Sequence, residues 1–169
     1  MNRFKPDHRY SSLSDIPIEE FARKGKRGAL LDIDNTLVAY GEYEKIPPEN
    51  LEWLKRAEAS GVKCLLYSNA SQWKIELIQK VANIPGVPKA YKPSSMQLGK
   101  ALSILGCTKD EALMIGDQWC TDILGGSLVG METILVEPLT ENDWCGTKIL
   151  RFIEWFAIPD RRPWRKKSR

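Results

Sequence analysis

Short apolar runs alternate with amphipathic stretches along most of the chain. The apolar runs are typical of buried strands, and the stretches between them carry apolar residues at helical spacing. The expected strands are 28–33, 62–67, 87–91, 112–115 and 133–136. The expected helices run from Pro48 to about Ala59, Ser71 to about Ala82, Ser94 to Gly106, Cys120 to Leu128 and Thr147 to about Ala157.

Local signals set several of these boundaries. Pro47 and Pro48 are typical of a helix start, and Ser94 with Gln97 three residues later predicts a capping box. Regular alternation of strand and helix predicts parallel βαβ units. The expected fold class is therefore α/β, a three-layer Rossmann-like sandwich around a central parallel sheet of about five strands.

With 169 residues, the chain is expected to form a single domain. We expect a basic leader (1–26), a catalytic core (27–137), a C-terminal helix region (138–158) and a basic tail (159–169). No apolar run approaches the roughly 18 residues that a membrane span needs, and residues 1–20 lack a hydrophobic signal core. We therefore expect a cytoplasmic protein, with peripheral contact at the inner face of the membrane as an open alternative.

Cysteine and histidine offer little catalytic or zinc-binding chemistry. The four cysteines, at positions 64, 107, 120 and 145, form no CxxC pair, and His8 is the only histidine. We expect reduced, mostly packed thiols and no histidine base.

Charge is distributed unevenly along the chain, since residues 28–150 carry a net −5 while residues 1–27 carry +3 and residues 151–169 carry +5. An acidic centre favours cation binding, and basic ends favour anionic surfaces.

Unusual polar residues follow four of the expected strands. Asp32 and Asp34 close the first, Ser68-Asn69 the second, Lys92 follows the third, and Asp117 closes the fourth with Asp122 five residues later. Each could be an ordinary turn, cap or solvated residue when taken alone. Together they indicate a site, because ligands of open α/β sheets bind beyond the carboxyl ends of the strands.

Converging carboxylates need a counter-charge. Two of them about 4 Å apart repel by roughly 4 kcal/mol at an effective dielectric near 20. Protons or a cation must remove that repulsion. Oxygen ligands without histidine or cysteine favour Mg²⁺, which accepts one or two carboxylates together with water and substrate phosphate.

The segments LDIDNTLV, Ser68, Lys92-Pro93 and GDQWCTD resemble, in order and spacing, the four motifs of the haloacid dehalogenase-like (HAD) phosphatases. This resemblance covers about residues 27–137. More narrowly, DNTLV, GDQ-x-x-TD followed by two glycines, TILVEPL and TKILRFIEW resemble the YqeG group of subclass IIIA, which is related to phosphatidylglycerophosphate phosphatases. Ser127-Leu128 and Leu150 depart from that group's usual Asn-Arg and Asn, which leaves the substrate open.

The resemblance implies that Asp32 is a nucleophile that forms an aspartyl-phosphate and also binds Mg²⁺. Asp34 would protonate the departing alcohol and then activate water, while its backbone carbonyl binds the metal. Asp117 would bind the metal through its side chain. Asp122 would not bind the metal directly; it would act through a water molecule or by orienting Lys92.

Ser68 and Lys92 would hold the phosphoryl oxygens of a phosphomonoester substrate. Asn69 is expected to bind the phosphate as well, and Thr36 is expected to support the metal-binding acids without contacting the metal. Either residue could instead serve only the geometry of its loop. Only 33 residues separate Asp34 from Ser68, and 23 separate Ser68 from Lys92. We therefore expect none of the cap domains that other HAD enzymes insert there, and an open site that suits a bulky or surface-bound substrate.

The C-terminal segment combines aromatic and basic residues, with Trp144, Trp155 and Trp164 near RRPWRKKSR. A packed helix with a solvated tail is one interpretation, and contact with an anionic membrane is the other. No nucleic-acid recognition motif is present, so no nucleic acid is expected as partner. The oligomeric state stays open.

The leading hypothesis is a magnesium-dependent phosphomonoesterase, with phosphatidylglycerophosphate as a candidate substrate. A soluble sugar phosphate, a phosphoprotein or a nucleic-acid end remains an alternative. A receiver-like module phosphorylated on aspartate is disfavoured, because receivers carry the phosphoacceptor on a later strand than their acid pair.

Overall fold

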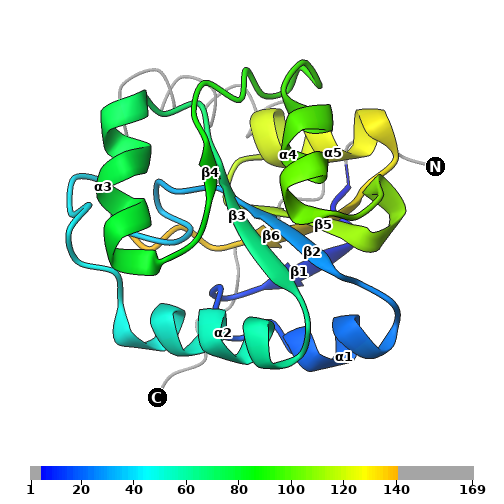
Figure 1. Cartoon of the computed structure of the whole chain (residues 1–169), viewed down its shortest axis with the longest axis horizontal. Coiled ribbons are helices and arrows are strands. Elements are labelled where there is room, and N and C mark those ends of the chain that lie inside the picture. Colours follow the sequence, from blue (N-terminus) through cyan, green and yellow to red (C-terminus); the bar gives the residue numbers. More distant parts are fainter. Residues whose placement is uncertain (1–4, 141–169) are drawn as a thin grey trace.

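A computed structural model describes residues 5–140, which form a parallel sheet between two layers of helices (Figure 1). The strands are β1 (His8–Tyr10), β2 (Gly28–Leu31), β3 (Lys63–Tyr67), β4 (Gly86–Val87), β5 (Ala112–Gly116) and β6 (Glu132–Val136). The α-helices are α1 (Ile18–Arg23), α2 (Pro48–Ala59), α3 (Gln72–Ala82), α4 (Leu98–Leu105) and α5 (Leu124–Val129). A 3-10 turn, η1 (Lys109–Glu111), precedes β5, and a π-helical turn, η2 (Trp119–Ile123), precedes α5. The α/β class and the parallel sheet are confirmed.

The sheet order is β1-β6-β5-β2-β3-β4, with every pair parallel. Strand β2 lies between β3 and β5, where the chain order switches direction across the sheet. Leu31 is level with Leu66 of β3 and Ile115 of β5. The residues that follow these three strands therefore emerge at one edge, which is where ligands bind in such sheets.

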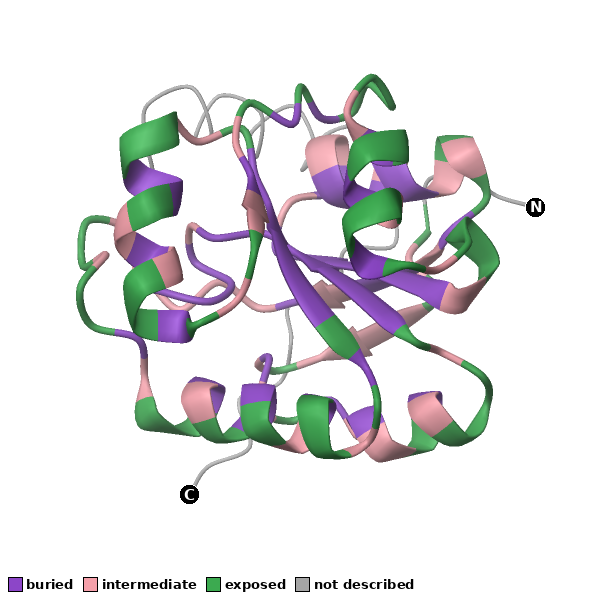
Figure 2. Ribbon diagram, in the orientation of Figure 1, coloured by how far each residue is buried: buried purple, intermediate pink, exposed green. Residues whose placement is uncertain are grey.

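Two apolar layers sandwich the sheet because side chains alternate between its faces. Ala29 and Leu31 of β2 point into the layer with α1, α2 and α3, whereas Leu30 points into the layer with α4 and α5. Strands β2 and β5 are buried along their whole length, and β3 is buried after Lys63 (Figure 2). Their near-continuous apolar sequences reflect burial on both faces.

The sheet has six strands, so the expectation of about five was one too few. The additional strand, β1, lies in the expected basic leader and pairs with β6 from His8↔Ile134 to Tyr10↔Val136. Its sequence, His-Arg-Tyr, lacks an apolar run, and the pairing with β6 makes it a strand. The leader also contributes to the core, since Leu13, Ile16, Ile18 and Phe21 are buried.

Two expected elements near Lys92 are shorter than predicted. The strand expected to reach Tyr91 stops at Val87, because Lys89 and Tyr91 have positive φ angles of 48° and 58°. The helix expected from Ser94 begins at Leu98, and its N-cap, Gln97, makes no side-chain capping bond. Turns occupy the interval, with backbone N–H groups of Ser94 and Leu98 donating to Tyr91 and Ser95.

The helix expected from Cys120 begins one residue earlier as η2 and continues as α5. None of the helices formed by residues 5–140 is long and apolar enough to cross a bilayer. The expected helix from Thr147, Leu150, the three C-terminal tryptophans named above and the basic tail lie outside the described residues.

Candidate functional site

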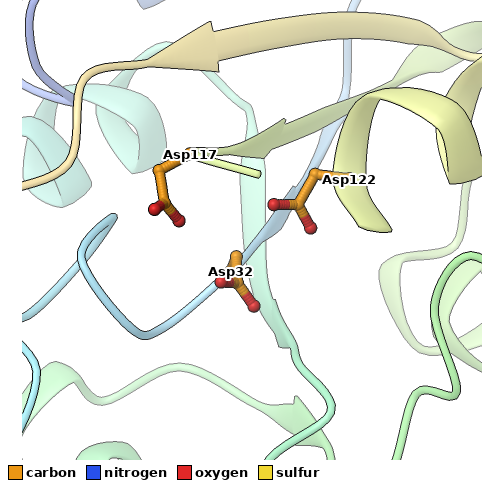
Figure 3. Close-up of side chains that lie close together, drawn as sticks. All are labelled: Asp32, Asp117 and Asp122. Carbon is orange, nitrogen blue, oxygen red and sulfur yellow. The ribbon is translucent and has the colours of Figure 1, made fainter. Parts of the chain in front are cut away.

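Three carboxylates converge where β2 and β5 end (Figure 3). Asp32 follows β2, Asp117 follows β5, and Asp122 lies in the π-helical turn η2. One carboxylate oxygen of each lies within 4.8 Å of the others. The exposed fractions are 5% for Asp32, 5% for Asp117 and 0% for Asp122, so water screens this charge poorly.

One ammonium group joins two of these acids. Lys92 Nζ donates to Asp32 Oδ1 at 2.7 Å and to Asp122 Oδ1 at 2.5 Å. Burial lowers the pKa of Lys92, but the two carboxylates outweigh it, so the net effect is a raised pKa and a charged lysine. Burial raises the pKa of Asp122, and Lys92 opposes that shift.

Asp122 reaches this position because Gly116 has no side chain. A Cβ atom built on Gly116 would lie 2.1 Å from Asp122 Oδ2. The backbone N–H of Gln118 donates to the same oxygen at 3.1 Å. A π-helical turn is a frequent feature of functional sites, and here it carries the acid that holds Lys92.

Asp34 lies apart from the three-acid cluster and pairs with Lys74 of α3. Lys74 Nζ donates to Asp34 Oδ1 at 2.7 Å and to Oδ2 at 2.6 Å. Burial raises the pKa of Asp34, with Lys74 acting in the opposite direction. Sequence reasoning missed Lys74, although a signal existed: it precedes Ile78 and Ala82 at four-residue spacing on the buried face of α3.

Thr36, Ser68 and Asn69 lie at the same edge of the sheet. Thr36 Oγ1 donates to Asp117 Oδ1 at 3.2 Å, and Ser68 is buried at 3% exposure. The amide of Asn69 donates to the backbone carbonyl of Lys92 at 3.0 Å and accepts from its N–H at 2.8 Å. Asn69 therefore fastens the loop after β3 to the segment that carries Lys92.

The donor set fits a hard divalent cation. Asp32, Asp117 and Asp122 supply oxygen atoms only, and within the described chain they form a cluster that could hold a metal ion. Lys92 is the counter-charge of Asp32 and Asp122, and a third buried carboxylate, Asp117, lies within reach of the same position. Carboxylates grouped in this way favour a divalent cation.

Comparison with known proteins identifies relatives of this chain. Residues 90–138 match the family model described as HAD-hydrolase-like. The chain is 31% identical over 151 residues to the probable phosphatase YqeG of Bacillus subtilis, covering 89% of this chain and 87% of that protein. It is also 30% identical over 143 residues to phosphatidylglycerophosphate phosphatase 1, chloroplastic, of Chlamydomonas reinhardtii. That match covers 79% of this chain and 53% of the algal protein, so the chain spans about half the length of that relative.

The fold has a counterpart among solved structures. An uncharacterized protein from Listeria monocytogenes superposes with a TM-score of 0.55 at 18% identity, over 69% of this chain and 84% of that one. This likeness concerns the fold alone. Because the similarity to the Bacillus protein extends over most of both sequences, the chain belongs to the HAD-like phosphatases, in the group that includes YqeG.

Proposed function

We propose that this protein hydrolyses phosphate monoesters with Mg²⁺ as cofactor and Asp32 as nucleophile. The observation that carries the proposal is the buried cluster of Asp32, Asp117 and Asp122, whose carboxylate oxygens lie within reach of one cation while Lys92 pairs with two of them. Buried charge of this kind is costly unless a ligand uses it. A bound cation would offset the negative charge of the carboxylates, and a phosphate ester would in turn bind to that cation and to Lys92.

Asp32, Asp117 and the backbone carbonyl of Asp34 would hold the ion, with Asp122 reaching it through water or acting through Lys92. When bound, Mg²⁺ would offset the charge of the phosphoryl oxygens and help to orient them. The ammonium of Lys92 would add a fixed positive charge beside the phosphoryl oxygens. The hydroxyl of Ser68 would donate a hydrogen bond to one of these oxygens.

In the first step a carboxylate oxygen of Asp32 forms a bond to phosphorus while the bond from phosphorus to the alcohol oxygen breaks. Asp34 gives its proton to that departing oxygen. In the second step Asp34 takes a proton from water, whose oxygen attacks phosphorus and releases phosphate from Asp32. The position of Asp34 supports this role, because Lys74 fixes both oxygens of a carboxyl that lies two residues from Asp32.

The direct test is turnover of p-nitrophenyl phosphate with and without Mg²⁺. We expect turnover that chelation of the metal abolishes, and a loss of at least about 100-fold in Asp32→Asn. Asp110→Asn is the matched control, because this exposed acid lies in η1, before β5 begins. Full activity of Asp32→Asn would refute the nucleophile, and a stable phosphorylated form without turnover would favour a receiver-like module.

We further propose a phospholipid monoester, phosphatidylglycerophosphate, as the substrate. The named activity of the algal relative supports this choice. The test compares phosphate release from that lipid in anionic vesicles with release from a panel of soluble sugar phosphates, phosphopeptides and nucleic-acid ends. Faster release from a soluble ester would reject the lipid and leave the chemistry intact.

A further inference from the structure

Two lysines pair with three of the four acids of this site. Lys92 holds Asp32 and Asp122, whereas Lys74 holds both oxygens of Asp34. We propose that Lys74 is a positioning residue that keeps the Asp34 carboxyl outside the cation cluster and available for proton transfer. This inference rests on the proposed function, since it concerns the residue assigned to move the proton.

Lys74 is firmly placed. It lies in the first turn of α3 with 8% of its surface exposed, beside the buried Ile75. The ring centroid of Tyr43 lies 4.0 Å from Nζ, and that of Tyr40 lies 5.6 Å away. Tyr43 in turn meets Trp73 edge to face at 6.2 Å. An ammonium enclosed by a carboxylate and aromatic faces has few alternative positions.

The placement of Lys74 explains why Asp34 is absent from the cluster. Asp34 follows Asp32 by two residues, and a carboxyl so close is drawn to any cation that the three acids bind. The paired hydrogen bonds from Lys74 engage both oxygens of Asp34 and so compete with that attraction. A fourth carboxylate would also change the metal preference, because Ca²⁺ accepts six to eight oxygen ligands whereas Mg²⁺ keeps several waters.

An ordinary stabilising ion pair is the alternative, and it predicts different results. If Lys74 only stabilised the fold, Lys74→Met would lower stability and would reduce turnover of all substrates alike. If it positions Asp34, the loss must depend on how much the leaving group needs a proton. Alkoxide is a poor leaving group and needs that proton, whereas p-nitrophenolate leaves largely without it.

The experiment therefore compares kcat/KM for glycerol 3-phosphate and p-nitrophenyl phosphate in wild type, Lys74→Met and Lys74→Gln. We expect a loss of about 10- to 100-fold with the alkyl ester and a loss at least fivefold smaller with the aryl ester. In an Asp34→Asn background, Lys74→Met should change either value by less than about twofold, because residues that act as a unit are not additive.

Metal binding supplies a readout that does not depend on turnover. Titration calorimetry with each cation alone should show Ca²⁺ affinity rising relative to Mg²⁺ in Lys74→Met, and no such change when Asp34→Asn is also present. Lys74→Arg should recover part of the alkyl-ester activity, since a guanidinium can hold both carboxylate oxygens. Lys80→Met, an exposed lysine on the same helix, is the control and should match wild type in all assays.

The inference would be overturned if folded Lys74→Met and Lys74→Gln lost equal activity with both esters. It would also be overturned if Lys74→Met reduced activity in the Asp34→Asn background as much as in wild type. Failure of the proposed function would look different, because wild type itself would then lack metal-dependent turnover of both esters.

Discussion

Gly116→Ala is expected to damage the site through a single steric conflict. The added methyl group would lie 2.1 Å from Oδ2, 2.2 Å from Cγ and 2.8 Å from Cβ of Asp122, all well inside van der Waals contact. Asp122 is fully buried and held by Lys92 at 2.5 Å, so its carboxyl cannot move into solvent. Overpacking of this kind costs about 1–3 kcal/mol, and separating the buried ion pair would bring the cost toward about 5 kcal/mol.

Urea unfolding measures that free energy directly, and thermal unfolding should show a fall of about 2–4 °C for each kcal/mol lost in a chain of this size. Mg²⁺ affinity should fall as well, because Asp122 is displaced from the cluster. Gly99→Ala is the control, since nothing lies within 4 Å of the Cβ position of this helical glycine. It should be neutral or raise stability by up to about 1 kcal/mol.

A second substitution tests the assigned cause. In an Asp122→Ala background the two shortest contacts, with Oδ2 and Cγ, are removed and the 2.8 Å contact with Cβ stays, so adding Gly116→Ala should cost less than about 1 kcal/mol. Stability of Gly116→Ala within about 0.5 kcal/mol of wild type, or an equal cost in both backgrounds, would refute the steric explanation.

Three further predictions concern buried charge, a surface ion pair and a buried thiol. Lys92→Met should lower the free energy of unfolding in metal-free buffer by about 3–5 kcal/mol, because two buried carboxylates lose their counter-charge; unchanged urea denaturation would contradict this. Hydrogen bonds from Arg56 lower the pKa of Glu19 to about 2, so this pair stabilises the fold above about pH 4.5 and ceases to do so as pH falls toward 2. Both side chains are more than a third exposed, at 38% and 42%, so Arg56→Met should lose less than about 1 kcal/mol at pH 6 and nothing near pH 2; a deficit that persists in acid would argue against the pair. Burial raises the pKa of Cys64 to about 12, so iodoacetamide at pH 8 should label it only after unfolding in urea, as peptide mass spectrometry would show.

Chain pattern alone was sufficient to predict the central sheet. Strands β2, β3 and β5 are short apolar runs, and the residues after each lie at one edge because parallel strands end together. The convergence of Asp32 and Asp117 could be predicted for that reason. The helices α2 and α3 were also predictable, since proline at the start of α2 and a helical apolar spacing are local features.

Other features depend on contacts between distant segments. Strand β1 has three residues with no apolar alternation, and only pairing with β6, more than 120 residues later, makes it a strand. The expected capping box at Ser94 did not form, while Thr108 and Glu111 form one just before β5. The hydroxyl of Ser94 instead accepts from the backbone N–H of Met96 at 3.3 Å, within the turn that precedes α4.

The sequence by itself determined which residues stand at the carboxyl ends of the strands, because hydrophobic periodicity and strand direction are encoded locally. Only the tertiary structure decided which carboxylates gather and which stands apart. Asp122 lies beside Asp32 and Asp117 because Gly116 leaves space for it, whereas Asp34 forms an ion pair with Lys74. These choices depend on steric fit and on pairing of charges across 30 to 60 residues of chain, and no local pattern records them.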